Sequence, residues 1–289
     1  MKIGLLGFGE VGQTLADDLL SVPDVTLCAY DIQFTGSDSV PRVAIRQRKS
    51  IVAAATAAEL AEDSEIVICA VTAAQDVAAT RSMVAGLARD AFVLDLNSVS
   101  PVTKRECAQI IDDVGGRYVE AAVMSPIAPK RIRSPVLLGG PHAAEFLPVA
   151  KALGFTAMRV VSEEVGQASA TKMCRSVIIK GLESLLAESL LTARHYRVEN
   201  DVLDSLRDLL KSPDWPALAY YMIGRSIEHG TRRAEEMREV AATVRSAGLD
   251  AWMSDACAKR QDWTARFHDA LDATALSDML DIMRREVSC

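Results

Sequence analysis

The stretch Lys2-Ile-Gly-Leu-Leu-Gly7-Phe-Gly9-Glu-Val-Gly12 indicates how the first half of the chain folds. Residues 2–6 form an apolar run that predicts a strand, and residues 11–20 have the periodicity of a helix. In a dinucleotide-binding turn the first glycine makes the tight turn, the second lets a pyrophosphate approach the backbone, and the third allows close packing of helix on strand. The cofactor-binding residues predicted here are Gly7, Phe8, Gly9, Glu10, Val11 and Gly12.

An acidic residue follows this turn at the distance that dinucleotide-binding folds use. Asp31 lies nineteen residues after Gly12, at the end of a second predicted strand over residues 26–30. A carboxylate there accepts hydrogen bonds from the ribose hydroxyls and repels a 2′-phosphate, so it favours NAD over NADP. NADP remains an alternative because basic residues follow, and a solvated loop is the other interpretation of this group: Arg42, Arg46, Arg48 and Lys49.

Short apolar runs alternate with helical patterns over the first half of the chain. This alternation is typical of a parallel sheet with crossover helices, and nearly continuous apolarity indicates strands buried on both faces. The predicted strands are residues 2–6, 26–30, 66–71, 92–96, 117–122 and 136–139, and the predicted helices are residues 11–20, 57–61, 77–87 and 103–113. We therefore expect an α/β Rossmann domain with a doubly wound, mostly parallel sheet at residues 1–163.

The pattern changes in the second half, where strand-like runs end and helical periodicity takes over. Helices are predicted at residues 167–196, 217–228, 231–247 and 251–267. Pro213 and Pro216 lie close together between the first two and are expected to stop a helix there. The sequence therefore predicts an all-α domain at residues 164–289.

Composition excludes several classes of function. The chain has 289 residues, 49% of them hydrophobic, and a formal net charge of -7. An acidic balance and 5% aromatic content disfavour a nucleic-acid partner, and no run is long enough to predict a membrane span. Six scattered cysteines without a CxxC pair indicate reduced thiols and a cytoplasmic protein, and no spacing predicts a metal site.

Four motifs in order along the chain resemble the β-hydroxyacid dehydrogenase superfamily, which includes 6-phosphogluconate and 3-hydroxyisobutyrate dehydrogenases. They are the glycine turn, Asp95-Leu-Asn-Ser-Val-Ser-Pro101, Val123-Met-Ser-Pro126 and Gly166-Gln-Ala-Ser-Ala-Thr-Lys172. The helical half, especially His229-Gly-Thr-Arg-Arg-Ala-Glu-Glu-Met-Arg238, is similar to a less characterised branch with a distinctive C-terminal domain.

The resemblance assigns roles to individual residues. Lys172 matches the general acid/base of the superfamily, and the chemistry requires such a group, because a carbinol hydroxyl must lose a proton as hydride leaves its carbon. The resemblance places Asn97 near the cofactor and Ser98 and Ser125 near the substrate. Val71 and Thr72 end the fourth-strand region and are expected to border the cofactor, with a purely structural strand end as the alternative. Helix capping by Ser100 before Pro101 is an alternative explanation for part of the 95–101 motif.

Two departures from the superfamily pattern concern the substrate. Relatives have asparagine four residues after the lysine, where this chain has Ser176 preceded by Arg175, which could pair with an anion. Relatives also follow the serine of the third motif with two glycines, whereas Pro126 here removes a backbone donor.

A pair of arginines completes the predicted substrate site. Arg232 and Arg233 are expected near the start of a helix, where they would oppose its dipole and could bind an anion. An ordinary ion pair with Glu235, Glu236 or Glu239 is the alternative.

These features predict an NAD(P)-dependent oxidoreductase that transfers hydride between a nicotinamide and the CH–OH group of a small β-hydroxy acid or related acid. The resemblance also implies a homodimer formed through the helical domain. Two alternatives stay open: an imine reductase-like enzyme, and a dinucleotide-binding regulator without turnover.

Overall fold

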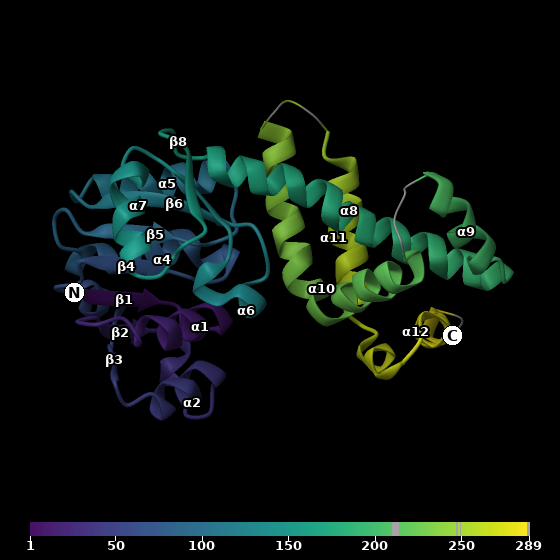
Figure 1. Cartoon of the computed structure of the whole chain (residues 1–289), viewed down its shortest axis with the longest axis horizontal. Helices are drawn as coiled ribbons and strands as arrows, with labels where there is room; N and C mark the ends of the chain where they lie inside the picture. The colour runs from purple at the N-terminus through teal and green to yellow at the C-terminus, as the bar shows by residue number, and fades with distance from the viewer. Residues whose placement is uncertain (210–213, 247, 249, 288–289) are drawn as a thin grey trace. The chain divides into compact units, whose positions relative to one another are not determined.

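The computed structural model describes residues 1–209, 214–246, 248 and 250–287. The chain forms two compact units, Met1–Lys172 and Met173–Cys289, and the division falls within the long helix α8 (Gln167–Tyr196) (Figure 1). No helix in these ranges combines the length and the apolar character that a membrane span requires.

The first unit is built on an eight-stranded sheet with the order β3-β2-β1-β4-β5-β6-β7-β8. All neighbouring strands are parallel except β6 and β7, so the predicted doubly wound, mostly parallel fold is confirmed. The strands are β1 (Lys2–Leu6), β2 (Thr26–Tyr30), β3 (Ile51–Ala53), β4 (Ile66–Cys69), β5 (Phe92–Asp95), β6 (Arg117–Val123), β7 (Val136–Gly139) and β8 (Met158–Ser162).

Two strands were not predicted from the sequence, and both lie at an edge of the sheet. β3 has only three residues, two of them exposed, and β8 is mostly half-exposed. An edge strand has one neighbour and carries little of the apolar signal on which the prediction rests.

Helices cover both faces of the sheet. Their apolar sides form one core with Ile3 and Leu5 of β1 and a second core with Leu6 on the other face. On the first face lie α1 (Glu10–Leu19), α2 (Val40–Gln47) and α7 (Ala143–Ala152), and on the second lie α3 (Ala57–Ala61), α4 (Asp76–Met83) and α5 (Pro101–Asp112). Short helical turns complete the unit: η1 (Ile32–Thr35), η2 (Ala73–Gln75), η3 (Val84–Gly86), α6 (Ile127–Lys130) and η4 (Arg131–Arg133).

The described secondary-structure elements of the second unit are all helical. Besides α8 it contains α9 (Glu199–Leu209), α10 (Trp215–Ser246), α11 (Trp252–Thr264), η5 (His268–Asp272) and α12 (Leu276–Val287). Its core contains Trp215, Ile223 and Ile227 of α10 together with Met279 and Leu280 of α12.

The prediction of two helices over residues 217–247 is wrong, because α10 is continuous from Trp215 to Ser246. Gly230 does not end the helix but allows α11 to approach it. A Cβ atom at Gly230 would lie 2.3 Å from the carbonyl oxygen of Gln261 and 2.8 Å from Cβ of Ala265. Gly230, which lies in the gap between the two predicted helices, is therefore a packing contact between α10 and α11.

We expect Gly230→Ala to destabilise the second unit, since the added methyl group forces α10 and α11 apart. The cost of such overpacking is about 1–3 kcal/mol, more than the roughly 0.5–1 kcal/mol that alanine gains over glycine within a helix. Gly224→Ala on the same helix is the matched control, because its Cβ would meet nothing closer than 3.7 Å. Thermal unfolding followed by circular dichroism tests this, and equal stability of the two variants would contradict it.

Candidate functional site

The glycine turn joins β1 to α1, and each glycine has a structural reason. Gly7 has φ of +96°, and a Cβ there would lie 2.3 Å from the carbonyl oxygen of Ala70. A Cβ at Gly12 would lie 2.2 Å from the carbonyl oxygen of Gly7. A Cβ at Gly9 would meet nothing within 4 Å. Two glycines thus close the turn, and the third leaves space beside the first amides of α1, where a pyrophosphate would fit.

Asp31 follows β2 and is tied to the same turn. Its carboxylate accepts hydrogen bonds from the backbone N–H of Phe8 at 2.8 Å and of Gln33 at 2.9 Å. A carboxylate has about four acceptor positions, so the ribose hydroxyls can still bind. Asp31 therefore lies beside the glycine turn, where a ribose would bind.

Arg48 is one of the basic residues that could favour NADP, but it bonds groups within the protein. Its guanidinium bonds the carboxylate of Asp17 on α1 at 2.7 and 2.9 Å and the carbonyl oxygen of Ala44 at 3.0 Å. This pairing raises the pKa of Arg48 and lowers the pKa of Asp17. Arg46 donates to the carbonyl oxygen of Ser37 at 3.0 Å.

Asn97 braces the ends of β4 and β5. Its side-chain oxygen accepts the Val71 N–H at 2.7 Å, and its amide donates to Asp76 at 2.7 Å and to the thiol of Cys69 at 3.2 Å. Asn97 is buried, whereas Thr72, next to Val71, is exposed. The structure therefore brings three predicted cofactor residues to one edge of the sheet, with Asn97 as support beneath that edge.

A cluster of buried charged groups lies next to Asn97. The ammonium of Lys104 bonds the Asp95 carboxylate at 2.8 Å and the Asp95 carbonyl oxygen at 3.0 Å. The hydroxyl of Tyr118 donates to the same carboxylate at 2.6 Å, and the Asn97 N–H donates to it at 2.9 Å. Asp95, Lys104 and Tyr118 are at most 1% exposed. Asp95 therefore joins β5, β6 and α5 in a single network.

Asp76 is an acid of this cluster whose charged form is disfavoured. Burial, followed by the neighbouring charge of Asp95, raises the pKa of Asp76 to about 7. One of its carboxylate oxygens, Oδ2, has no hydrogen-bond partner among the described residues. Around neutral pH a substantial fraction of Asp76 is therefore protonated, next to the Lys104–Asp95 ion pair.

Asp76, Asp95 and Cys107 place ligand-type atoms within 4.8 Å of one another. A divalent ion would have to displace or oppose the Lys104 ammonium, which already compensates the charge of Asp95. Burial also raises the pKa of the Cys107 thiol to about 12, which disfavours the thiolate that a metal requires. The donor set does not suit a metal.

Lys172 lies in the second turn of α8, and its ammonium donates a hydrogen bond to the hydroxyl of Ser98. Ser98 follows the Asp95–Asn97 brace, so these two predicted site residues meet at the carboxyl edge of the sheet. Ser100 caps α5 by accepting the Thr103 N–H at 3.2 Å, with Pro101 at the first helical position. The 95–101 motif thus combines a site residue with a helix cap.

The remaining predicted substrate residues have different surroundings. Ser125 is half-buried, and its hydroxyl donates to the Pro126 carbonyl oxygen at 3.2 Å. In the second unit, Ser176 is buried and accepts from Lys180 at 3.3 Å, while Arg175 is exposed. Their roles in binding substrate stay predictions.

The expectation that Arg232 and Arg233 lie near a helix start is wrong, because both lie well inside the continuous helix α10. Arg232 forms the ion pair with Glu236 at 2.6 Å that was the alternative. Arg233 is buried and paired with Glu183 of α8. The helix-dipole argument for an anion site therefore no longer applies to either arginine.

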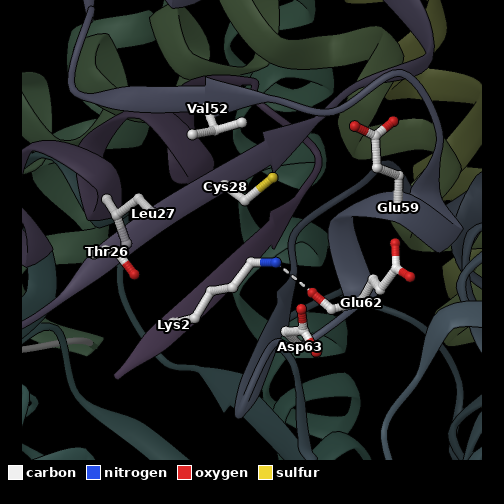
Figure 2. Close-up of a pocket in the computed structure, with 8 residues that line it drawn as sticks. All are labelled: Lys2, Thr26, Leu27, Cys28, Val52, Glu59, Glu62 and Asp63. Carbon is white, nitrogen blue, oxygen red and sulfur yellow. Dashed lines mark hydrogen bonds between the residues drawn. The ribbon is translucent and has the colours of Figure 1, made fainter.

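A separate pocket of about 310 Å³ opens at the amino ends of β1 and β2, and none of the predicted site residues lines it. Figure 2 shows Lys2 there, donating a hydrogen bond to the carbonyl oxygen of Glu62. The other lining residues are Thr26, Leu27, Cys28, Val52, Glu59 and Asp63. Ligands of doubly wound sheets bind at the carboxyl ends of the strands, so this pocket is not the expected cofactor site.

Sequence reasoning missed the buried polar support: Asp76, Lys104, Tyr118 and Glu120. Glu120 lies inside the apolar strand β6 (Arg117–Val123), and Asp95 ends the apolar strand β5. A charged residue within an apolar run is the signal that could have identified them, because such a residue needs a buried partner.

Asp76→Asn should stabilise the protein at high pH. A carboxyl group whose pKa is about 7 in the folded state and near 4 when unfolded binds more protons when folded, so wild-type stability falls as pH rises from about 4 to about 7. Asparagine keeps the shape without this titration. The expected gain is roughly 1–3 kcal/mol at pH 8, shrinking towards pH 5. Thermal melts across this range, with the exposed Asp38→Asn as control, measure it; a gain independent of pH would contradict it.

Comparisons with known proteins agree with this geometry. A family model described as the NAD binding domain of 6-phosphogluconate dehydrogenase matches residues 2–162, and a domain of unknown function (DUF1932) matches residues 193–264. A conserved hypothetical protein from Sinorhizobium meliloti 1021 has a solved structure that is 34% identical, with a TM-score of 0.76 over 99% of this chain and 96% of that one.

Two further relatives extend the comparison. An uncharacterized 28.5 kDa protein of Methanothermus fervidus is 28% identical over 251 residues, which are 86% of this chain and 93% of that protein. A 3-hydroxyisobutyrate dehydrogenase of Mycobacterium tuberculosis shares the fold at 15% identity, with a TM-score of 0.72 over 99% of this chain and 98% of that one.

The first family model covers more than half of the chain, and the described fold and glycine turn agree with it. The chain therefore belongs to the family that carries the NAD-binding domain of 6-phosphogluconate dehydrogenase, within the β-hydroxyacid dehydrogenase superfamily and with a distinct helical C-terminal domain.

Proposed function

We propose that this protein is an NAD-dependent oxidoreductase that interconverts the CH–OH and C=O groups of a small β-hydroxy acid or related acid. The observation that carries the proposal is the hydrogen bond from Lys172 to Ser98, within the unit that also contains the glycine turn. An amine and a hydroxyl side by side at the carboxyl edge of a doubly wound sheet suit proton transfer to a bound substrate.

The cofactor preference follows from Asp31. The first amides of α1 and the space beside Gly9 would hold the pyrophosphate, and the Asp31 carboxylate would hold the ribose hydroxyls. Arg48 is bonded to Asp17, so it is committed to α1 rather than to a 2′-phosphate. When bound, the nicotinamide supplies the hydride acceptor or donor.

The proton is handled by this chain's own side chains. In the oxidising direction Lys172, as the neutral amine, takes the proton of the substrate hydroxyl, and in the reducing direction its ammonium returns a proton to the carbonyl oxygen. Ser98 holds the amine at the sheet edge and can share a hydrogen bond with the same substrate oxygen. An acidic substrate places its carboxylate away from Asp31 and the buried acids, near cationic or hydroxyl groups such as Ser125.

A dinucleotide-binding regulator without turnover is the second candidate. It is favoured by Pro126, which removes a backbone donor next to Ser125 where the superfamily pattern has glycine. An imine reductase-like activity is the third candidate, and Lys172 argues against it, because imine reductases commonly place another donor at this position.

The test follows nicotinamide absorbance while the purified protein is incubated with NAD or NADP and a panel of small β-hydroxy acids. We expect Lys172→Ala to lower kcat/KM by about 10²- to 10⁴-fold, the contribution of a general acid/base, while the Kd for NADH stays within about twofold. Lys151→Ala, an exposed lysine of α7, is the matched control and should retain wild-type turnover.

Turnover that survives in Lys172→Ala would remove the proposed role of this lysine. NADH binding without turnover of any acid in the panel would favour the regulator instead.

A further inference from the structure

A row of aligned residues crosses the centre of the sheet just before its carboxyl edge. Cys69 of β4 pairs in register with Asp95 of β5, Asp95 with Glu120 of β6, and Glu120 with Gly139 of β7. Aligned residues on neighbouring strands point to the same face of a sheet. The row therefore contains two acids in succession, each buried, followed by a glycine without a side chain.

Each acid of the row has its own partner. Asp95 bonds Lys104, as described above. Glu120 instead accepts backbone hydrogen bonds from Gly166 at 2.7 Å and from Ser169 at 2.6 Å, and it is 0% exposed. These two N–H groups belong to the start of α8, which would otherwise leave them without helical partners. The carboxylate thus caps α8 from a strand more than 40 residues earlier in the chain, at the helix end whose dipole favours an anion.

Two glycines leave the space that this cap needs. A Cβ at Gly139 would lie 2.5 Å from Oε2 of Glu120. Gly166 has φ of +108°, a conformation that a residue with a side chain rarely adopts, and it turns the chain from β8 into α8. The position of the Glu120 carboxylate is therefore determined from both sides, by the strand that neighbours it and by the helix that it caps.

The cap lies one helical turn before Lys172. Ser169 and Lys172 are three residues apart on α8, so a first turn held in place by Glu120 determines where the Lys172 side chain begins. The other end of that side chain meets Ser98, which follows Asp95, the neighbour of Glu120 in the row. Both partners of the Lys172–Ser98 contact are thus anchored to adjacent positions of the same row.

We propose that Glu120 is a positioning residue that holds Lys172 against Ser98 by fixing the first turn of α8 to β6. This inference rests on the proposed function, in which Lys172 moves the proton of the substrate. Glu120 itself touches neither substrate nor cofactor, and its effect on the reaction passes through α8. A conventional cap from a neighbouring residue would stabilise the helix without setting its place on the sheet.

The experiment measures how fast Lys172 is acetylated by a small acylating reagent near neutral pH, using peptide mass spectrometry of the whole chain, with exposed Lys151 as the internal reference. A hydrogen bond from the ammonium to Ser98 favours the charged, unreactive form, so loss of that contact should speed acetylation. We expect at least about a threefold increase in Glu120→Ala relative to wild type.

A second variant displaces the Glu120 carboxylate without removing it. Gly139→Ala places a methyl group against the Glu120 carboxylate and should speed acetylation of Lys172 to a similar extent. In the double variant with Glu120→Ala, the methyl group has space and should add nothing further. If Glu120→Ala does not fold, Gly139→Ala carries the test alone.

Phe146→Leu controls for lost stability, because Phe146 is buried in the core on the other face of the sheet. This variant should leave the Lys172 acetylation rate at the wild-type value. An unchanged rate in folded Glu120→Ala and Gly139→Ala would overturn the proposal, as would an equal increase in Phe146→Leu.

Acetylation of Lys172 needs no substrate, so the positioning role of Glu120 can be tested independently of the proposed oxidoreductase activity. If Glu120→Ala speeds acetylation of Lys172 but the wild-type protein turns over no hydroxy acid, the proposed reaction is contradicted and the positioning role of Glu120 is supported. Once a substrate is known, Glu120→Ala should lower kcat about 10- to 100-fold, as a misplaced catalytic group does, with the Kd for NADH within about twofold.

Discussion

The ion pair between Lys104 and Asp95 is the interaction on which the carboxyl edge of the sheet depends. Both groups are buried, and removing either would leave a charge without its partner, which costs several kcal/mol in a protein interior. Asp95 also receives the Tyr118 hydroxyl and the Asn97 N–H, and Asn97 in turn holds Val71 and Asp76. Without this ion pair, the ends of β4 and β5 would lose their arrangement, and β6 would lose its contact through Tyr118.

The carboxyl edge of the sheet combines an open glycine turn with a row of buried acids beneath it. The glycine turn offers space beside the first amides of α1, which have no acceptor within a helix, so it can receive a ligand. The acid row beneath the edge is buried, and its carboxylates are bonded to Lys104 and to the start of α8. A site that binds a charged cofactor and moves a proton needs both, because donors must be open to the ligand while the side chains that aim them stay fixed. Burying charged side chains costs free energy of desolvation. In return, each charge must meet its partner, so few arrangements of the strands and helices that carry them are possible.

The fold of the first unit could be predicted from sequence, and the residues of its candidate site could be proposed from it, because both rest on local signals. Strand runs, the glycine spacing and Asp31 all occur within short windows, and Gln167–Tyr196 was predicted with the bounds that the structure gives. The support could not be predicted, since the partners Glu120 and Ser169 are 49 residues apart and only the sheet register brings them together. The continuity of α10 through Gly230 could not be predicted for the same reason, because the close approach of Gln261 and Ala265 is visible only in the packed structure.

The central claim is that the turn at the start of the chain binds a nicotinamide dinucleotide. Isothermal titration of the wild-type protein with NADH and with NADPH, at fixed ionic strength, tests it most directly. We expect one NADH site per chain and at least about tenfold weaker binding of NADPH, because Asp31 repels the 2′-phosphate, a repulsion worth roughly 1.4 kcal/mol or more. Absence of binding by either nucleotide would contradict the account, and tighter binding of NADPH would contradict the role given to Asp31.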